Sequence, residues 1–393
     1  MRRRRARPGT LALVLIVAAV IVLAITRTAP RGRVTGTATA RIPPPASATA
    51  IAPRSVTPTP LPPTVTPTTP PPTATAALIR PTPPAQSPAA PVATPSGTLT
   101  GKVQAIRARD LPATNSVTLI ALDGREVHLD DARAEYPAST VKLPIYLTLA
   151  HRIQTGAVNV TWETLITVQP GDIVGGTGVL QNAPGSTHTV REIAQLMIVE
   201  SDNVAANILL GRLGGGQDTS REHVRAGAAV VTEYLNALGV RGMTVRHGLL
   251  DPEAFATNTL STTTSAALAH LLQITERDRA TLDGAADVLA LLGERGTHNP
   301  WHPADAIACD LSVERIGGIY PASADRPGVR LDALVVTTPG NTLRYILAVT
   351  VPTTPALEPT VETQIARFEG DIQFLLTGHW AQCVDSTTRQ ATP

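Results

Sequence analysis

The sequence predicts an α+β domain in which helices pack on an antiparallel sheet and a second lobe is entirely helical. Strand-like patterns stand at both ends of the region after residue 110, and helical patterns fill its middle, which is typical of this fold class. The chain has 393 residues, no Asp or Glu before Asp110, and all 11 of its aromatic residues at Tyr136 or later. A segment without acidic and aromatic residues cannot build an ordinary core, so the folded part is expected to begin near residue 100.

The individual elements follow from local composition and spacing. A β-rich run at 116–122 is followed by an Asp-Gly turn and a second short strand at 126–129. Apolar residues at helical spacing then predict a series of helices, and the helix at 262–273 opens with three threonines, which are good N-cap residues. Strands resume on either side of a Pro-Gly-Asn turn. The expected helices are at 140–154, 190–199, 203–213, 221–238, 262–273, 281–292 and 358–376, and the later strands are at 329–337 and 343–351.

The charge divides at the same place as the aromatic residues. The first 109 residues hold 14 of the 33 Lys and Arg residues and no acid, whereas residues 110–393 hold 19 Lys and Arg against 31 Asp and Glu, a net charge of −12. Because the folded part is acidic, we expect no nucleic acid among its partners.

Residues 1–33 predict a cytoplasmic Arg cluster and a transmembrane signal anchor. Five Arg lie in residues 2–7, and an unbroken apolar run of 15 residues spans 11–25, which flanking threonines extend to about 10–26. This length is at the short end of what spans a bilayer, and the Arg cluster favours an inside N-terminus. A cleaved signal peptide is the alternative. Both interpretations place the remainder of the chain outside the cytoplasm, and the anchor makes it a single-pass cell-membrane protein.

Residues 34–98 are expected to form a disordered stalk. The stretch 41–98 holds 18 of the 35 prolines, mixed with Thr, Ala and Ser, so it cannot bury enough surface to offset its ordering entropy. Such a stalk would hold the domain at 99–385 away from the membrane, and residues 386–393 would be a flexible tail.

Ser139 and Lys142 form the first chemical motif, Ser-x-x-Lys, at the start of an expected helix. A Ser hydroxyl is a weak nucleophile, and an amine one helical turn away can serve as its base if the charged form of the amine is disfavoured. The chain contains only two lysines, Lys102 and Lys142, against 31 arginines, and an Arg could not act as the base because it stays protonated. An ordinary capped helix start is the alternative interpretation.

Ser201-Asp202-Asn203 lies downstream of this motif. Alone, this tripeptide would more often be a turn or an N-cap. In combination with Ser-x-x-Lys at this spacing, the chain resembles the penicillin-recognising serine enzymes, and class A β-lactamases most closely, over about residues 116–377. The resemblance implies a β-lactamase/transpeptidase-like fold with a catalytic cleft between the sheet and the helical lobe.

The resemblance also implies a role for each matching residue. Ser139 would be the acylated nucleophile, and Lys142 would be its base or proton relay. Ser201 would pass a proton to the leaving nitrogen. Asn203 would bind Lys142 and the substrate amide.

The family's third motif, Lys-Thr-Gly on a strand, is best matched by Arg315-Ile316-Gly317, followed by Gly318. Arg315 keeps the positive charge, whereas Ile316 removes a hydroxyl that would bind the substrate carboxylate. Arg315, Gly317 and Gly318 are therefore expected to bind substrate, with the N–H groups of Ser139 and Gly318 as oxyanion donors. From the residues alone, the same stretch is only a strand end.

The chain departs from class A β-lactamases at the residue that frees the acyl-enzyme. In that family a Glu, two residues after an Arg, activates the hydrolytic water. Here Arg246-His247-Gly248 places Gly248 at that position. Asp251 and Glu253 are the nearest carboxylates and the candidates for a relocated base, although a solvated loop charge is the alternative for both.

Cys309 and Cys383 are the only cysteines, and in an exported chain they are candidates for a disulfide, with two free thiols as the alternative. The nine His residues show no metal-binding spacing. We expect no metal, no cofactor and a monomer.

The sequence thus predicts a bacterial, membrane-anchored, extracytoplasmic serine hydrolase of the β-lactamase type. Its substrate would be a small β-lactam or a peptidoglycan stem peptide, with acylation at Ser139 and slow hydrolysis of the acyl-enzyme. Two alternatives remain open: a penicillin-binding-protein-like carboxypeptidase or transpeptidase, and a non-catalytic wall-binding module.

Overall fold

The structure, a computed structural model, describes residues 97–298, 311–324, 326–338 and 342–378. The expected membrane anchor, the stalk up to residue 96, both cysteines and the C-terminal tail lie outside these ranges. Within them, no helix combines the length and the apolar character that a membrane crossing requires.

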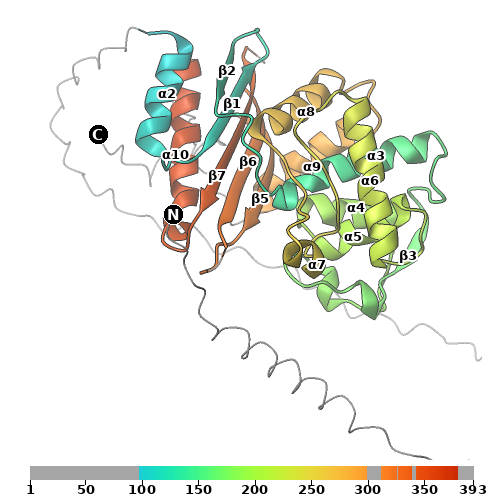
Figure 1. Cartoon of the computed structure of the whole chain (residues 1–393). Coiled ribbons are helices and arrows are strands. Elements are labelled where there is room, and N and C mark those ends of the chain that lie inside the picture. The colour runs from blue at the N-terminus through green and yellow to red at the C-terminus, as the bar shows by residue number, and fades with distance from the viewer. Residues whose placement is uncertain (1–96, 299–310, 325, 339–341, 379–393) are drawn as a thin grey trace, which may run out of the picture. The chain divides into compact units, whose positions relative to one another are not determined.

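A five-stranded antiparallel sheet forms the middle layer of the described domain (Figure 1). Its strand order is β2-β1-β7-β6-β5, and each neighbouring pair is antiparallel. The strands are β1 (Ser116–Ala121), β2 (Glu126–Leu129), β5 (Ser312–Tyr320), β6 (Gly328–Thr337) and β7 (Arg344–Thr353). With helices on both sides of this sheet, the predicted α+β class is confirmed.

Two helices from opposite ends of the domain cover one face of the sheet. These are α2 (Leu99–Asp110) and α10 (Glu358–Thr377), which lie side by side in Figure 1. The apolar side chains beneath them form a compact cluster that includes Phe368 and Tyr345. Helix α2 was not predicted, because only Val103 and Asp110 are fully buried along it and apolar spacing is almost absent.

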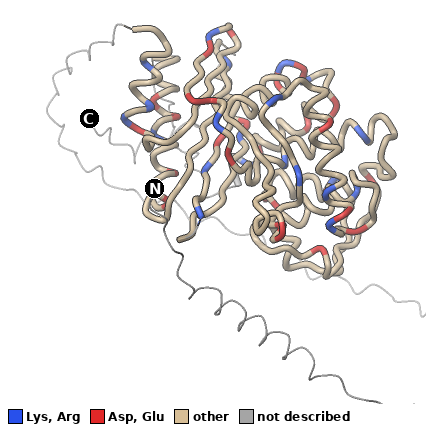
Figure 2. Tube along the Cα trace, in the orientation of Figure 1, with Lys and Arg blue, Asp and Glu red and all other residues tan. Residues whose placement is uncertain are grey.

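The second face of the sheet meets the helical lobe. Helices α8 (Ser265–Arg277) and α9 (Ala285–His298) pack closest to the strands, and α3 (Lys142–Gln154) runs through the lobe with nine buried residues. The remaining elements are α4 (Val190–Val199), α5 (Asn203–Leu213), α6 (Arg221–Ala237), α7 (Pro252–Ala256) and a ribbon of β3 (Leu165–Thr167) and β4 (Thr187–Thr189). Figure 2 shows residues of both charges interspersed over these helices.

Side-chain caps fix several helix starts close to the predicted places. Thr189 and Glu192 form a reciprocal capping box on α4, and Thr264 caps α8 through the N–H of Ala267. Helix α8 begins three residues later than predicted, because Thr262 and Thr263 form β-bridges to neighbouring segments instead.

Candidate active site

Ser139 lies in a tight 3-10 turn, Ala138–Val141, directly before α3. Ala138 has a φ of +46°, a left-handed conformation that costs on the order of 1–3 kcal/mol for a residue with a side chain. Thr140 secures the turn by donating its hydroxyl hydrogen to the carbonyl of Pro137 at 2.7 Å. Ser139 remains partly exposed while Ala138, Thr140 and Val141 are buried, so Ser139 is the most accessible residue of this turn.

Lys142 is the first residue of α3 and is fully buried. Its Nζ lies 3.0 Å from Ser139 Oγ, 2.9 Å from Ser201 Oγ and 2.9 Å from Asn203 Oδ1, and it donates to the Ser201 carbonyl at 2.6 Å. An ammonium group has three hydrogens for these four oxygens. A hydroxyl of Ser139 or Ser201 can therefore donate to the amine when the amine is neutral.

The surroundings of Lys142 favour that neutral form. Burial lowers the pKa of Lys142 well below its ordinary value, the positive charge of Arg295 lowers it further, and the negative charge of Asp202 opposes the shift. A neutral amine 3.0 Å from Ser139 Oγ can accept the proton that the hydroxyl loses when it attacks a carbonyl carbon.

Ser201 lies within hydrogen-bond distance of both Lys142 and Ser139. Its Oγ lies 3.0 Å from Ser139 Oγ, and its backbone φ is +55°, again left-handed. The turn is fixed by the next residue, because the Asp202 carboxylate accepts the N–H of Ala205 at 2.9 Å and of Leu180 at 2.8 Å. The two hydroxyls and the amine thus form a closed triangle of hydrogen bonds.

Asn203 and the glycine-rich stretch at 175–178 form the neighbouring wall. Asn203 Nδ2 donates to the carbonyl of Gly175 at 3.4 Å while its Oδ1 faces Lys142. A Cβ on Gly176 would lie 2.3 Å from Asn203 Nδ2, and the φ of Gly176 is +75°. Glycine is therefore required for the close approach of this stretch to Asn203.

Strand β5 supplies the opposite wall through Gly318. A Cβ at this position would lie 2.9 Å from the carbonyl oxygen of Pro137 and 3.2 Å from the Cβ of Ala138. The strand thus packs directly against the turn that carries Ser139. Gly318 therefore lies next to the turn of Ser139, whereas the expected role of Gly317 and Gly318 in substrate binding stays a prediction.

Arg315 does not line this wall, and its predicted substrate-binding role is wrong. Its side chain is buried and forms ion pairs with Asp332, at 2.8 Å, and with Glu369 of α10. Successive residues of a strand alternate between faces, so Arg315 and Gly318, three apart, point to opposite sides of the sheet. The alignment by motif found the right strand but not the direction of this side chain.

Arg295 of α9 is the buried cation near Lys142, and sequence analysis missed it. It is only 3% exposed, and it donates to the carbonyls of Ile198 at 3.0 Å and of Gly317 at 3.5 Å. Its Nε has no partner among the described residues. Burial lowers the pKa of Arg295 to about 10.

A sequence signal for Arg295 did exist. The residue follows Val288 and Leu292 at helical spacing, and both of these are fully buried. An arginine on the apolar stripe of a helix is a candidate for a buried functional charge.

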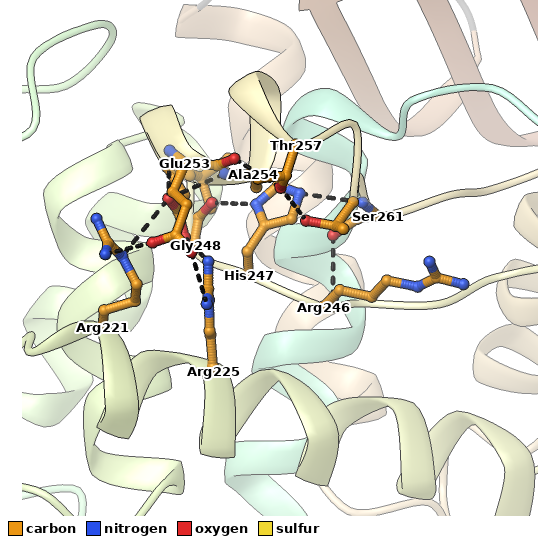
Figure 3. A network of polar contacts seen from close by, with 12 residues as sticks. Arg221, Arg225, Arg246, His247, Gly248, Glu253, Ala254, Thr257 and Ser261 are labelled. Carbon is orange, nitrogen blue, oxygen red and sulfur yellow. Dashed lines mark hydrogen bonds and ion pairs between the residues drawn. The ribbon is translucent and has the colours of Figure 1, made fainter.

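Asp251 and Glu253 both face α6 rather than the nucleophile. The Asp251 carboxylate caps α7 by accepting the N–H groups of Glu253 and Ala254, and it lies 3.2 Å from Arg225. Glu253 forms ion pairs with Arg221 and Arg225, as Figure 3 shows. Both candidate bases are therefore engaged as ion-pair partners of α6.

Gly248 is enclosed by two helices. A Cβ there would lie 2.6 Å from Asn207 Oδ1 of α5 and 2.7 Å from Val224 Cγ1 of α6. The recess between Gly248 and the turn before α3, lined also by Ala138 and Val141, is too narrow to hold a water molecule. The resemblance matches Gly248 to the deacylating carboxylate of class A β-lactamases, and a side chain could not be added here without displacing Asn207 and Val224.

His247, next to Gly248, is no substitute base. Its Nε2 accepts the N–H of Ser261 at 3.0 Å, so its Nδ1 carries the hydrogen and donates to the carbonyl of Gly248 at 2.7 Å (Figure 3). Burial lowers the pKa of His247, which keeps the ring neutral. Both ring nitrogens thus hold the loop in place.

A buried lysine shared by a Ser-x-x-Lys turn and a Ser-Asp-Asn turn, on this α+β scaffold, defines the class of β-lactamase-like serine hydrolases. The model of the β-lactamase enzyme family matches residues 98–367. The chain therefore belongs to this family.

The curated relatives are similar over short stretches. A β-lactamase of Rhodobacter capsulatus is 36% identical over 77 residues, which are 20% of this chain and 26% of that protein. The β-lactamase L2 of Stenotrophomonas maltophilia is 32% identical over 114 residues, or 28% of this chain and 33% of the relative. These matches span about a quarter to a third of the length of each relative.

Solved structures are similar in fold over most of the described domain. PBP-A superimposes with a TM-score of 0.59 at 23% identity, covering 72% of this chain and 97% of PBP-A. The TLA-3 extended-spectrum β-lactamase gives a TM-score of 0.60 at 18% identity, covering 71% and 98%. Because these identities are below 25%, the similarity shows a shared fold only.

Proposed function

We propose that this protein is acylated at Ser139 by a β-lactam or a related amide and that it releases the acyl group slowly. The observation that carries the proposal is the contrast between the network around Lys142 and the surroundings of Gly248. The side chains of Ser139, Ser201 and Asn203 are assembled around the buried Lys142, whose Nζ lies 2.6–3.0 Å from four oxygens of these three residues. The position of the deacylating carboxylate is closed around Gly248.

The acylation step follows from the hydrogen bonds of the triangle. Neutral Lys142 takes the proton of Ser139 Oγ as this oxygen bonds to the substrate carbonyl carbon. The N–H groups of Ser139 and Gly318 stabilise the carbonyl oxygen as it becomes negative. The proton then moves from Lys142 through Ser201 to the amide nitrogen, the C–N bond breaks, and an ester on Ser139 remains.

Slow deacylation follows from the loop at 247–253. Hydrolysis of the ester needs a water held and activated beside it, and general-base help is typically worth about 10²–10⁴-fold. Asp251 and Glu253 are held by Arg221 and Arg225, and Gly248 has no side chain that could activate a water. An adduct lasting minutes or longer is therefore expected. A variant of PBP-A, similar to this chain in fold, has been solved as an acyl-enzyme complex with penicillin G.

The substrate class is an amide next to a carboxylate, which describes both a β-lactam and a peptidoglycan stem peptide. Arg295 supports this, because its positive charge lies close to Lys142 and to the carbonyl of Gly317. We also propose that the domain is extracytoplasmic and anchored by residues 10–26, on the strength of the Arg cluster, the apolar run and the Pro-rich stalk.

The test is intact-mass measurement of the purified domain with a fluorescent penicillin over time. A mass increase of one penicillin that persists for minutes and is absent from Ser139→Ala supports the proposal. Absence of any adduct would favour a non-catalytic wall-binding module, although that alternative leaves the assembled Lys142 network without a use. An adduct that is lost within seconds would show that the protein is an efficient β-lactamase.

A further inference from the structure

Three aromatic rings from three separate segments meet one another in the described domain. Tyr136 stands three residues before Ser139, Phe255 belongs to α7, and Tyr320 ends β5 two residues after Gly318. The ring centroids are 5.0 Å apart for Phe255 and Tyr320, 5.1 Å for Tyr136 and Tyr320, and 5.4 Å for Tyr136 and Phe255.

Arg326 covers this aromatic trio from outside. Its guanidinium carbon lies 4.6 Å from the centroid of Tyr320 and 4.8 Å from that of Phe255, both within the range of cation–π attraction. The Phe255 and Tyr320 rings are nearly parallel, at 11°. The contact joins Phe255 of α7, in the helical lobe, to Tyr320 at the end of β5, so it connects the helical lobe to the sheet.

The direction of the substrate follows from the site itself. Ser201 protonates the leaving nitrogen, so it marks the leaving-group end. Arg295 connects this end to β5, because its guanidinium donates to the carbonyl of Ile198, at the end of α4, and to the carbonyl of Gly317. The acyl part of the substrate must then extend the other way along β5, beyond Gly318. Tyr320 is on the same face of the strand as Gly318, because residues two apart share a face.

We infer that Tyr136, Phe255 and Tyr320, covered by Arg326, close the acyl end of the cleft and select acyl donors whose acyl side chain is small or flat. The inference rests on the proposed function. A bulky group at this end would have to separate Phe255 from Tyr320 and displace Arg326 before the carbonyl could reach Ser139. A compact acyl group needs no such opening.

The test compares two β-lactams that share one ring system and differ only at the acyl end. One is 6-aminopenicillanic acid, which carries a bare amino group, and the other is a penicillin with a 2,6-dimethoxybenzoyl side chain. Acylation rate constants for Ser139 are measured by intact mass for the wild-type protein, Phe255→Ala and Tyr320→Ala. The matched control is Phe374→Ala, which removes an exposed ring on α10.

The quantity of interest is the rate for the bulky penicillin divided by the rate for the compact one. In the wild type this ratio should be well below one. Phe255→Ala and Tyr320→Ala should raise the ratio by roughly tenfold or more, because a bulky acyl group then no longer has to break one to two ring contacts. Phe374→Ala should leave it unchanged. A merely structural role for the trio would change both rates together and leave their ratio constant.

The outcomes separate this inference from the proposed function. Adducts on the wild type with the same ratio in every variant would overturn the aromatic selection and leave acylation at Ser139 intact. Absence of adducts with either compound would overturn both. If an alanine variant does not fold, Phe255→Leu provides the same comparison, since it removes the ring and retains an apolar side chain.

Discussion

Replacing Gly248 tests whether close packing around this residue excludes a side chain there. In Gly248→Ala the new Cβ would lie 2.6 Å from Asn207 Oδ1 and 2.7 Å from Val224 Cγ1, closer than such atoms come in folded proteins. Asn207 holds the loop by accepting the N–H of Leu249 at 2.7 Å and donating to its carbonyl at 3.1 Å. The methyl group must therefore push Asn207 away from both backbone groups.

The magnitude follows from these two effects. Weakening buried hydrogen bonds costs about 1–3 kcal/mol, and overpacking a closed site costs about 1–3 kcal/mol. Together, Gly248→Ala should lower the free energy of unfolding by roughly 2–6 kcal/mol, or Tm by about 5–20 °C in a domain of this size. Calorimetry or urea unfolding measures the loss.

Gly171→Ala is the matched control, because a Cβ at Gly171 would meet no atom within 4 Å and its φ is not left-handed. Its stability should stay within about 1 kcal/mol of the wild type. The same crowding predicts that Gly248→Glu cannot restore deacylation. Wild-type stability of Gly248→Ala, or a folded Gly248→Glu protein that frees its penicillin a hundred times faster, would refute this reasoning.

Four further predictions concern protons and charges. Lys142→Arg should slow acylation by about 10²–10⁴-fold, because the guanidinium stays protonated; a near-normal rate in stopped-flow fluorescence would mean that another group takes the proton. Arg295→Met removes a positive charge that lowers the pKa of Lys142, so the rise of the acylation rate with pH should move to higher pH, and an unmoved profile would contradict this role. Asp251→Asn and Glu253→Gln should leave the lifetime of the penicillin adduct unchanged, and a lengthened lifetime in either would identify a relocated base. Burial raises the pKa of Glu369, although the charge of Arg315 opposes this, so the folded state holds a proton at a pH where the unfolded state releases it; stability should fall as the pH rises above about 4.5, and Glu369→Gln should flatten this slope in urea titrations.

The residues that sequence analysis placed correctly are those whose position depends on local structure. Ser139 and Lys142 are brought together by one turn of chain, and Ser201 and Asn203 by a second turn at a helix start. Apolar spacing likewise predicted most helices, because each buries one stripe of side chains. Local rules suffice for such features.

Features that depend on a distant partner were missed. Strand β5 was not among the strands predicted from the residue pattern, because it contains Glu314, Arg315 and two glycines, and only the motif match placed residues 315–317 on a strand. Its charges are tolerated inside the domain only because other segments supply partners, such as Glu369 of α10 for Arg315. The orientation of Arg315 and the presence of Arg295 depend on these long-range contacts, which no motif encodes.

The account of Gly248 needs both the local sequence and the long-range contacts. The resemblance implies that a carboxylate is missing at Gly248, and from the sequence alone a Glu could simply be substituted there. Only the packing of α5 and α6 against the glycine explains why a side chain cannot be added.

The burial of Lys142 has a practical consequence for chemical labelling. Of the two lysines, Lys142 is fully buried, whereas Lys102 is partly exposed on α2, across the sheet from the helical lobe. An amine-reactive dye should therefore modify Lys102 and the α-amino group and spare Lys142. Immobilisation of the domain through Lys102 would attach it to a sensor surface by the side of the sheet away from Ser139, so that β-lactams could reach the cleft during a binding measurement.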